Sequence, residues 1–473
     1  MIRKIAWKEI IELSRDGRLR WSAAIVYTLL AVSLVAGRQH YHLVRQQHEQ
    51  AQQAMRTQWL SQGSKNAHSA AHYGIYAFKP KLPLSFVDTG LDAFTGVAVW
   101  LEAHKQDEFR FRPAQDATAV QRFGELTAAA VLELLVPLVI ILLTFSSIAG
   151  ERENGTLRQL FSIGVERRTL ATGKALGVAA VLAGLLIPAA LVGASALVAG
   201  SDIADLSSSL GRIVTMAAAY VVYFATFLAL GLAASAWVRT ARATLLALLA
   251  FWIVSTLFVP RGIAEIARRM YPAPSAMEFA ERVEHDIDFG LDGREPRAAR
   301  NAAFKAAVLK KYGVDRVEAL PVSFVGLTLL EGEEYGNKVF DKNYGDLWAT
   351  FRRQHIFHQL GSLMSPFLAM RSVSMGLAGT DFEQHQDFAT AAENYRRLLT
   401  RTMNTEVAIH AGQSGRAYMS GPEVWASLPP FKYEAPGLMW VLGNQRLSLA
   451  MLIFWCLAAW TIAISLIRRT QVV

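Results

Sequence analysis

Residues 126–160 read LTAAAVLELLVPLVIILLTFSSIAGERENGTLRQL, a long apolar run that ends abruptly in charged residues. A helix rises 1.5 Å per residue, so about 20 apolar residues cross the roughly 30 Å hydrocarbon core of a bilayer. Residues 126–149 are long enough and apolar enough to do this. The stretch therefore predicts a membrane-spanning helix that emerges directly into a charged segment, residues 150–160.

Five further apolar runs predict membrane-spanning helices at residues 21–37, 175–199, 213–238, 243–259 and 447–467. The run over 243–259 is short, and we expect it to stop at Pro260. Hydrophobic residues make up 52% of the chain and charged residues 18%, against about 45–50% and about 25% in soluble domains. The predicted fold is therefore an all-α polytopic membrane protein with six transmembrane helices.

Lysine and arginine gather at one set of span ends. They occur in residues 1–20 and 150–174, at Arg239 and Arg242, and at Arg468 and Arg469. With six crossings these four segments fall on one side of the membrane, while the opposite loop, residues 201–209, has two aspartates and no basic residue. Basic loops stay in the cytoplasm, so both termini are predicted to be cytoplasmic.

Residues 1–20 predict a helix that lies along the cytoplasmic face of the membrane. Apolar and charged positions recur on opposite faces at helical spacing, with Ile2, Ile5, Ala6, Ile10 and Leu13 against Lys4, Lys8 and Glu12. This amphipathic pattern suits the membrane interface. The alternative is an ordinary charged helix end, and a cleaved signal peptide is disfavoured because the apolar run is too long.

Two long segments, residues 38–125 and 260–446, are predicted to lie outside the cytoplasm. The first opens with residues 41–60, which lack proline and glycine and extend the first helix, and it turns irregular around residues 79–83. The second is large enough for its own core. Its apolar residues follow a helical period, so it is predicted to be mainly helical.

The segment from Gly150 to Leu160 is the strongest indication of function. Its charges follow the second span directly, break at Asn154 and Gly155, and give way to a short amphipathic helix. This pattern predicts a rigid helical projection suited to docking on another protein. The alternative is a solvated loop that carries positive-inside charge.

Glu151, Arg152, Glu153, Gly155, Thr156 and Leu157 resemble the signature of ABC-2-type permeases, in which Glu-Arg-Glu-x-Gly-Thr-Leu follows the second span. Arg167, Arg168, Thr169, Gly173 and Lys174 continue the resemblance into the third span. In that family the loop holds the coupling helix, which sits in a cleft of the ATPase. The resemblance implies ABC-2-type permease architecture and ATPase-coupling roles for Glu151, Arg152, Glu153, Gly155, Thr156, Leu157 and Leu160.

The same resemblance implies the partners of the chain. We expect two copies of an ABC ATPase subunit, a second permease subunit that is identical or a sister, membrane lipid, and no nucleic acid. The expected location is the bacterial inner membrane.

A second resemblance lies in residues 260–446, between the fifth and sixth spans. The segment looks like a domain of unknown function found within such permeases, on the residues Leu320-Pro321, Glu333 to Gly336, Ser365-Pro366, Ser372 to Asp381, Phe388, Glu393, Tyr395-Arg396 and Asn404. In the usual family arrangement only short re-entrant helices occupy this position. The large insertion is therefore a departure that leaves the outer gate undefined.

The chain lacks a phosphate-binding loop of the form G-x-x-x-x-G-K-[ST]. The nearest match is Gly173-Lys174, but position 168 is arginine and position 175 is alanine. We therefore expect no enzyme activity and no cofactor on this chain, with ATP and Mg bound by the partner ATPase.

Histidine pairs raise the possibility of a metal site, at His68 and His72, at His355 and His358, and among His40, His42 and His48. Without thiolates or an HExxH motif, surface histidines on polar helices are the favoured interpretation, and no metal site is predicted. Glu133, within the second span, is a candidate conduit residue because a lipid-facing carboxylate is costly; the alternative is that it lies near the outer interface, hydrogen-bonded to a neighbouring helix. Tyr220 and Tyr223 either line the same conduit or pack between helices.

Two functions fit these observations. The first is the permease subunit of an ABC-type exporter, which couples ATP hydrolysis on a separate ATPase to export or extraction of a substrate. The second is an ABC-coupled sensing or force-transmitting protein that acts through its outer domain without a conduit. A membrane hydrolase ranks last, because the sequence shows no nucleophile–base arrangement.

Overall fold

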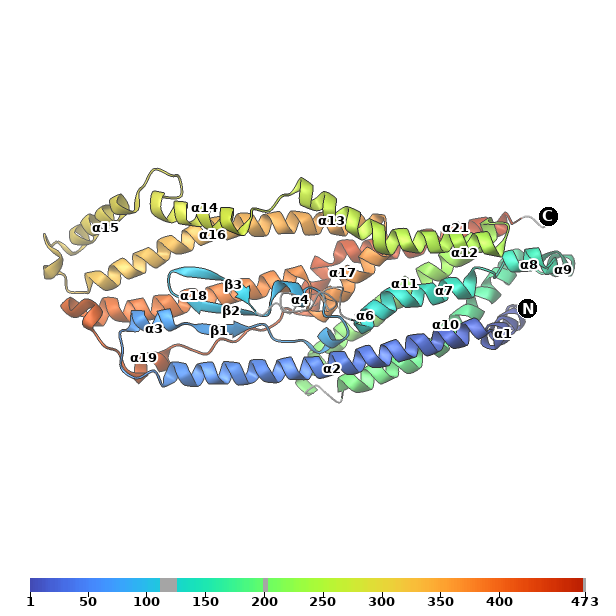
Figure 1. Cartoon of the computed structure of the whole chain (residues 1–473), viewed down its shortest axis with the longest axis horizontal. Coiled ribbons are helices and arrows are strands. Elements are labelled where there is room, and N and C mark those ends of the chain that lie inside the picture. Colours follow the sequence, from blue (N-terminus) through green and yellow to red (C-terminus); the bar gives the residue numbers. More distant parts are fainter. Residues whose placement is uncertain (111–125, 199–202, 471–473) are drawn as a thin grey trace.

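The computed structural model describes residues 1–110, 126–198 and 203–470. The molecule is elongated and almost wholly helical, with the first and last described residues at the same end (Figure 1). Six helices are long and apolar enough to cross a membrane. The predicted all-α polytopic membrane fold is confirmed.

Each predicted span coincides with one of the six long helices: Gly17–Leu60, Ala128–Glu153, Arg167–Val198, Ser209–Trp237, Ala241–Met270 and Arg446–Arg468. They comprise α2 (Gly17–Leu60), α6 to α8 (Ala128–Ala130, Val136–Thr144 and Ala149–Glu153), α10 (Arg167–Val198), α11 (Ile203–Trp237), α12 and α13 (Ala241–Ile253 and Val259–Met270), and α21 (Arg446–Arg468).

The helix of the fifth predicted span does not stop at Pro260 but continues to Met270. A π-helical turn, Val254–Phe258, connects α12 to α13 just before this proline. Proline lacks an N–H and clashes with the carbonyl four residues earlier in an α-helix, and the wider turn changes that hydrogen-bond pattern. The second span uses the same device, with a π-helical turn at Val131–Leu135 before Pro137.

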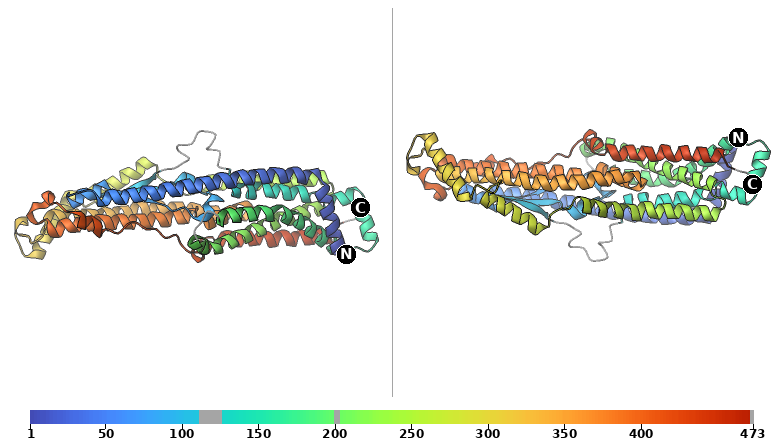
Figure 2. Two further views of the ribbon diagram at one scale, coloured as in Figure 1. Left: turned by 90° about the horizontal axis from the view of Figure 1, so that it is seen from below. Right: turned by 90° about the horizontal axis from the view of Figure 1, so that it is seen from above.

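The end of the bundle that holds both chain ends is here called the terminal end. It carries α1 (Ile2–Arg15), α8, α9 (Thr156–Ser162), the link between α11 and α12, and the last turn of α21 (Figure 1). The four basic segments of the sequence therefore lie together. Helix α1 runs across the bundle rather than along it (Figure 2).

At the other end lies the distal domain, formed by the described residues of 38–110 and by residues 271–437. Helix α2 continues into it as far as Leu60, as predicted. After α3 (Ala67–Tyr73), the strands β1 (Ile75–Phe78), β2 (Ala98–Glu102) and β3 (Lys105–Arg110) form an antiparallel sheet in the order β1-β2-β3. The sheet was not predicted, because β3 is short and polar and lacks alternating apolar residues.

The rest of the distal domain is helical, as predicted, with α14 (Ala276–Phe289), α15 (Arg297–Tyr312), α16 (Phe324–Leu360), α18 (Phe382–His410) and α19 (Pro422–Ser427). We predicted two separate outer segments, but they share one core. Trp59 and Leu101 from the first pack in the same apolar cluster as Phe388, Met403 and Trp425 from the second.

Helix α17 (Pro366–Ala378) leaves the distal domain and packs among the spans. All its residues except Arg371 are buried. Its Met370 and Val373 belong to the same apolar cluster as Ile140 and Phe227 of the second and fourth spans. We predicted that residues 260–446 form a large domain with its own core. The middle of this segment instead re-enters the bundle.

Two side-chain contacts hold the re-entrant segment. The indole N–H of Trp455, well inside α21, donates to the carbonyl of Ser362 at 2.9 Å. The hydroxyls of Ser255 and Ser365 lie 2.8 Å apart. Because hydrocarbon offers no hydrogen-bond partners, backbone that enters the bundle must be satisfied by protein groups of this kind.

Helix α1 packs closely against α10 at Gly173 and Gly177, and this contact generates a prediction. A Cβ at Gly173 would lie 2.6 Å from side-chain atoms of Ile5, whereas a Cβ at Gly184, further along α10, meets nothing within 4 Å. We expect Gly173→Val to cost roughly 1–3 kcal/mol through overpacking. Thermal unfolding in detergent should show a lower midpoint for Gly173→Val than for the control Gly184→Val. Equal midpoints would contradict the close packing of α1.

Candidate functional site

The segment from Gly150 to Leu160 folds as a helical hairpin, α8 followed by α9, at the terminal end (Figure 1). The hairpin begins where the second span turns away from its axis. There the hydroxyl of Ser235 in α11 donates to the carbonyl of Phe145 at 2.9 Å and accepts from the N–H groups of Ile148 and Ala149. One buried hydroxyl thus satisfies three backbone groups at the bend.

The turn between the two helices depends on Gly155, whose φ is 73°. A Cβ at this glycine meets nothing within 4 Å, so the backbone conformation, and not space, requires glycine here. After the turn Leu157, only 1% exposed, packs with Ile148, Val165 and Ile467. The apolar face of α9 therefore fixes the hairpin against the second, third and sixth spans.

Arg152 ties the hairpin to the fourth span. Its guanidinium donates from Nη1 to the carbonyl of Val238 and from Nη2 to that of Ala236, both at 2.8 Å. These carbonyls lie at the end of α11, where backbone acceptors have no partner within the helix and the helix dipole favours a cation. Arg152 is thus a helix cap held by its own hairpin.

A buried ion cluster connects the hairpin to α1 and α10. Lys174 Nζ lies 2.8 Å from Glu9 Oε2 and 3.0 Å from Glu151 Oε1, and Lys8 Nζ lies 3.3 Å from Glu151 Oε1. Lys174 is 4% exposed. The buried carboxylates of Glu9 and Glu151 therefore each have a cation partner, and the exposed Lys8 also pairs with Glu12 at 3.3 Å.

The structure separates the predicted coupling residues into two groups. Glu151, Arg152, Thr156, Leu157 and Leu160 are buried or half-buried and hold the hairpin to the bundle, whereas Glu153 and Gly155 are exposed at its tip. Further exposed residues on this surface, which sequence reasoning did not single out, are Asn154, Arg158, Gln159, Ser162 and Ile163. Ile163 is 70% exposed, an uncovered apolar side chain beside charged ones. The face from Glu153 to Ile163 is here called the hairpin surface.

Sequence reasoning also missed Glu9 and misassigned Lys174 as a loop charge. Glu9 falls at a position where the period of Ile2, Ile5 and Leu13 calls for an apolar residue. A carboxylate on an apolar face, together with a lysine at the start of a span, was the signal for a buried pair.

Glu133, Tyr220 and Tyr223 do come together, but inside one subunit. Their exposed fractions are 2%, 6% and 0%, and Tyr223 donates its hydroxyl to the backbone carbonyl of Glu133 at 2.8 Å. The three side chains therefore pack together within the chain, and their role in a conduit stays a prediction.

Hydrogen bonds connect Tyr220 of this group to the distal domain. The hydroxyl of Tyr220 lies 3.2 Å from that of Ser374 in α17, which donates to Asp88 Oδ2 at 2.5 Å. Burial raises the pKa of Asp88, while the hydrogen bond from Ser374 opposes that rise. A continuous chain of buried polar contacts thus links the fourth span, the re-entrant helix and the distal domain.

Comparison with known protein families gives one match. Residues 276–434 match a family described as a domain of unknown function (DUF3526); the occurrence of such a domain within ABC-2-type permeases stays a prediction. The match runs from α14 to the residues before α20 (Leu438–Asn444), so it includes α17 but none of the six spans. No curated protein matches the chain.

The ion cluster generates the second prediction. Lys174→Met leaves Glu9 without its cation in a buried site, which costs roughly 3–5 kcal/mol for a broken buried pair. We expect a clear drop in the thermal midpoint in detergent, whereas Arg168→Met, which removes an exposed charge from the same helix, should change it little. The double variant Glu9→Gln with Lys174→Met should recover part of the loss. A double variant as unstable as the single one would contradict the pairing.

Proposed function

We propose that this chain is the membrane-spanning subunit of an ABC-type exporter that takes its ATPase from a separate chain. The observation that carries the proposal is the helical hairpin at the terminal end, in which Glu151, Arg152 and Leu157 face the bundle while the hairpin surface, from Glu153 to Ile163, is exposed. An exposed helix with charged residues and one uncovered apolar side chain suits a cleft on a partner protein.

The contacts that attach the hairpin to the spans are suited to transmitting force. Arg152 connects the hairpin to α11, the ion cluster connects it to α1 and α10, and the apolar cluster around Leu157 connects it to α21. A push on the hairpin surface therefore acts on several spans at once. This is the mechanical requirement for a subunit whose energy comes from outside the chain.

In this proposal the terminal end faces the cytoplasm of a bacterium, the distal domain lies beyond the inner membrane, and two ATPase subunits dock below a pair of permease subunits. The basic residues of the terminal end support this direction, since short basic segments remain cytoplasmic. The second permease is either an identical copy or a sister chain. ATP and Mg belong to the ATPase.

A specific observation favours a second candidate, transmission of force to the distal domain without a conduit. Helix α2 runs without interruption for 44 residues, which is about 66 Å at 1.5 Å per residue, and it packs in the cores of both the bundle and the distal domain. The contacts among Tyr220, Ser374 and Asp88 provide a second connection. Substrate movement in proteoliposomes that contain the ATPase distinguishes the candidates, since only the exporter carries cargo across.

The turn at Gly155 provides the third prediction. Proline fixes φ near −65°, which the left-handed turn cannot accept, whereas asparagine adopts positive φ more readily than most residues. We expect Gly155→Pro to abolish co-purification of the ATPase and stimulation of its ATP hydrolysis, and Gly155→Asn to retain both. Glu153→Ala should weaken both, because it removes an exposed charge from the hairpin surface.

The matched control for Glu153→Ala is Glu166→Ala, an exposed glutamate at the same end that lies outside the hairpin. All variants should insert in the membrane at wild-type levels. Normal ATPase coupling in both Gly155→Pro and Glu153→Ala would overturn the proposed docking surface. Loss of coupling in Glu166→Ala to the same degree would show that general charge, and not the hairpin, is recognised.

A further inference from the structure

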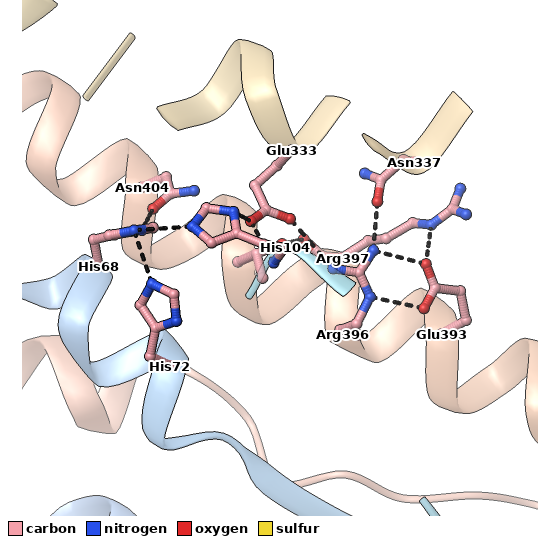
Figure 3. A network of polar contacts seen from close by, with 10 residues as sticks. His68, His72, His104, Glu333, Asn337, Glu393, Arg396, Arg397 and Asn404 are labelled. Atoms are coloured by element: carbon pink, nitrogen blue, oxygen red, sulfur yellow. Dashed lines mark hydrogen bonds and ion pairs between the residues drawn. The ribbon is translucent and has the colours of Figure 1, made fainter. Parts of the chain in front are cut away.

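Three histidines from two segments of the chain meet on the surface of the distal domain. His68 and His72 lie one turn apart on α3, and His104 lies in the turn between β2 and β3 (Figure 3). The sequence offered the first two as a pair but gave no reason to add the third. Among the described residues, this is the group of three or more metal-ligating side chains that the fold brings within reach of one ion.

The separation of the ring nitrogens matches a tetrahedral metal site. His68 Nε2 lies 3.2 Å from His72 Nε2 and 3.3 Å from His104 Nε2. Zinc binds imidazole nitrogen at about 2.0–2.1 Å, so two ligands at a tetrahedral angle are about 3.3 Å apart. Two of the three pairs therefore already stand at ligand spacing, and all three ligand atoms lie within 4.8 Å of one another.

In His68 and His104 the second ring nitrogen, Nδ1, has a partner that leaves Nε2 free to bind a metal ion. His104 Nδ1 lies 2.7 Å from Glu333 Oε1, and His68 Nδ1 lies 2.8 Å from the amide oxygen of Asn404. A carboxylate or amide oxygen accepts a hydrogen bond from the Nδ1–H group, so the lone pair stays on Nε2 in both rings. Carboxylate–histidine contacts of this kind orient metal-binding imidazoles.

This arrangement has an electrostatic consequence. With both Nδ1 atoms protonated, the Nε2 lone pairs of His68 and His104 face each other at 3.3 Å with no hydrogen between them. Two acceptors at this distance repel, and a cation between them removes the repulsion. This arrangement thus favours a positive centre between the rings, either a metal ion or an additional proton.

The backbone is also strained to place His104. It is the non-glycine residue in the described chain with positive φ, at 71°, a conformation that costs of order 1 kcal/mol or more. The turn is pinned from both sides, since the N–H of Ala103 donates to the carbonyl of Ala71 in α3 and the N–H of His104 donates to Glu333. Strain held in place by such contacts commonly marks a functional position.

Behind the histidines lies a buried ionic network that keeps Glu333 in position. Arg396, with no exposed surface, donates to Glu333 Oε2 at 3.2 Å and to Glu393 at 2.8 and 2.9 Å (Figure 3). Its guanidinium also donates to the amide oxygen of Asn337 at 2.5 Å. These residues all lie within the family match, and the proposed function does not use them.

We infer that His68, His72 and His104 bind one transition-metal ion, with Zn²⁺ as the best fit, through their three Nε2 atoms. His72 and His104 are exposed, so the ion enters from solvent and its fourth position is open to water or another ligand. Bound metal joins α3 and the β2–β3 turn, and through Glu333 and Asn404 it connects them to α16 and α18. The site thus locks together the two chain segments that form the distal domain.

The test uses the full-length protein in detergent, stripped with EDTA, loaded with ZnCl₂ and desalted before elemental analysis. The wild type should retain stoichiometric zinc and bind Co²⁺ with the visible spectrum of a tetrahedral site. Glu333→Gln, which removes a residue that orients a ligand, should lower the zinc affinity roughly 10–100-fold. His72→Ala and His104→Gly remove a ligand itself and should lower the zinc affinity by more than that. His410→Ala, an exposed histidine outside the cluster, is the control.

His104→Gly also separates binding from folding, because glycine accepts the positive φ without strain. Its thermal midpoint in EDTA should equal or exceed that of the wild type, while the stabilisation that zinc gives the wild type should be absent. Failure of the wild type to retain zinc would overturn the inference and leave a proton-sharing histidine cluster. Equal zinc retention by His72→Ala and His104→Gly would also overturn it, by placing the metal elsewhere.

Discussion

The constraint on which this structure depends is that a bilayer provides no partners for polar groups, so the protein must supply them. The terminal end shows how this is done. Ser235 satisfies the bend after the second span, Arg152 caps the fourth, and Lys174 balances Glu9 and Glu151. Each contact that satisfies a buried group also connects two elements. The attachment of the hairpin to the spans therefore follows from the need to satisfy buried polar groups within the protein.

The same constraint explains how the distal domain is coupled to the bundle. Helix α17 enters among the spans only because Trp455, Ser255 and neighbouring side chains satisfy the segment that leads to it. Its polar residue Ser374 then connects Tyr220 of the fourth span to Asp88 of the distal domain. The spans and the distal domain are thus connected through buried polar contacts.

If a metal ion binds where the three histidines meet, it adds a further connection within the distal domain. The first outer segment provides all three imidazoles, while the second provides Glu333 and Asn404, which orient two of them. The metal affinity and the packing of the two segments are then linked. Anything that separates α3 from α16 and α18 also moves Glu333 and Asn404 away from the imidazoles that they orient.

The sequence by itself determined the six spans, the gathering of basic residues at one end, the mainly helical character of residues 260–446 and the charged segment after the second span. These follow from composition and from neighbours one helical turn apart, which a linear pattern records directly. Only the tertiary structure decided that Glu151 faces inward and Glu153 outward, that the helix passes Pro260, that β3 is a strand, and that His104 joins His68 and His72. The physical reason is that these outcomes depend on packing between segments far apart in the chain, and spacing along one segment carries no record of what another segment places against it.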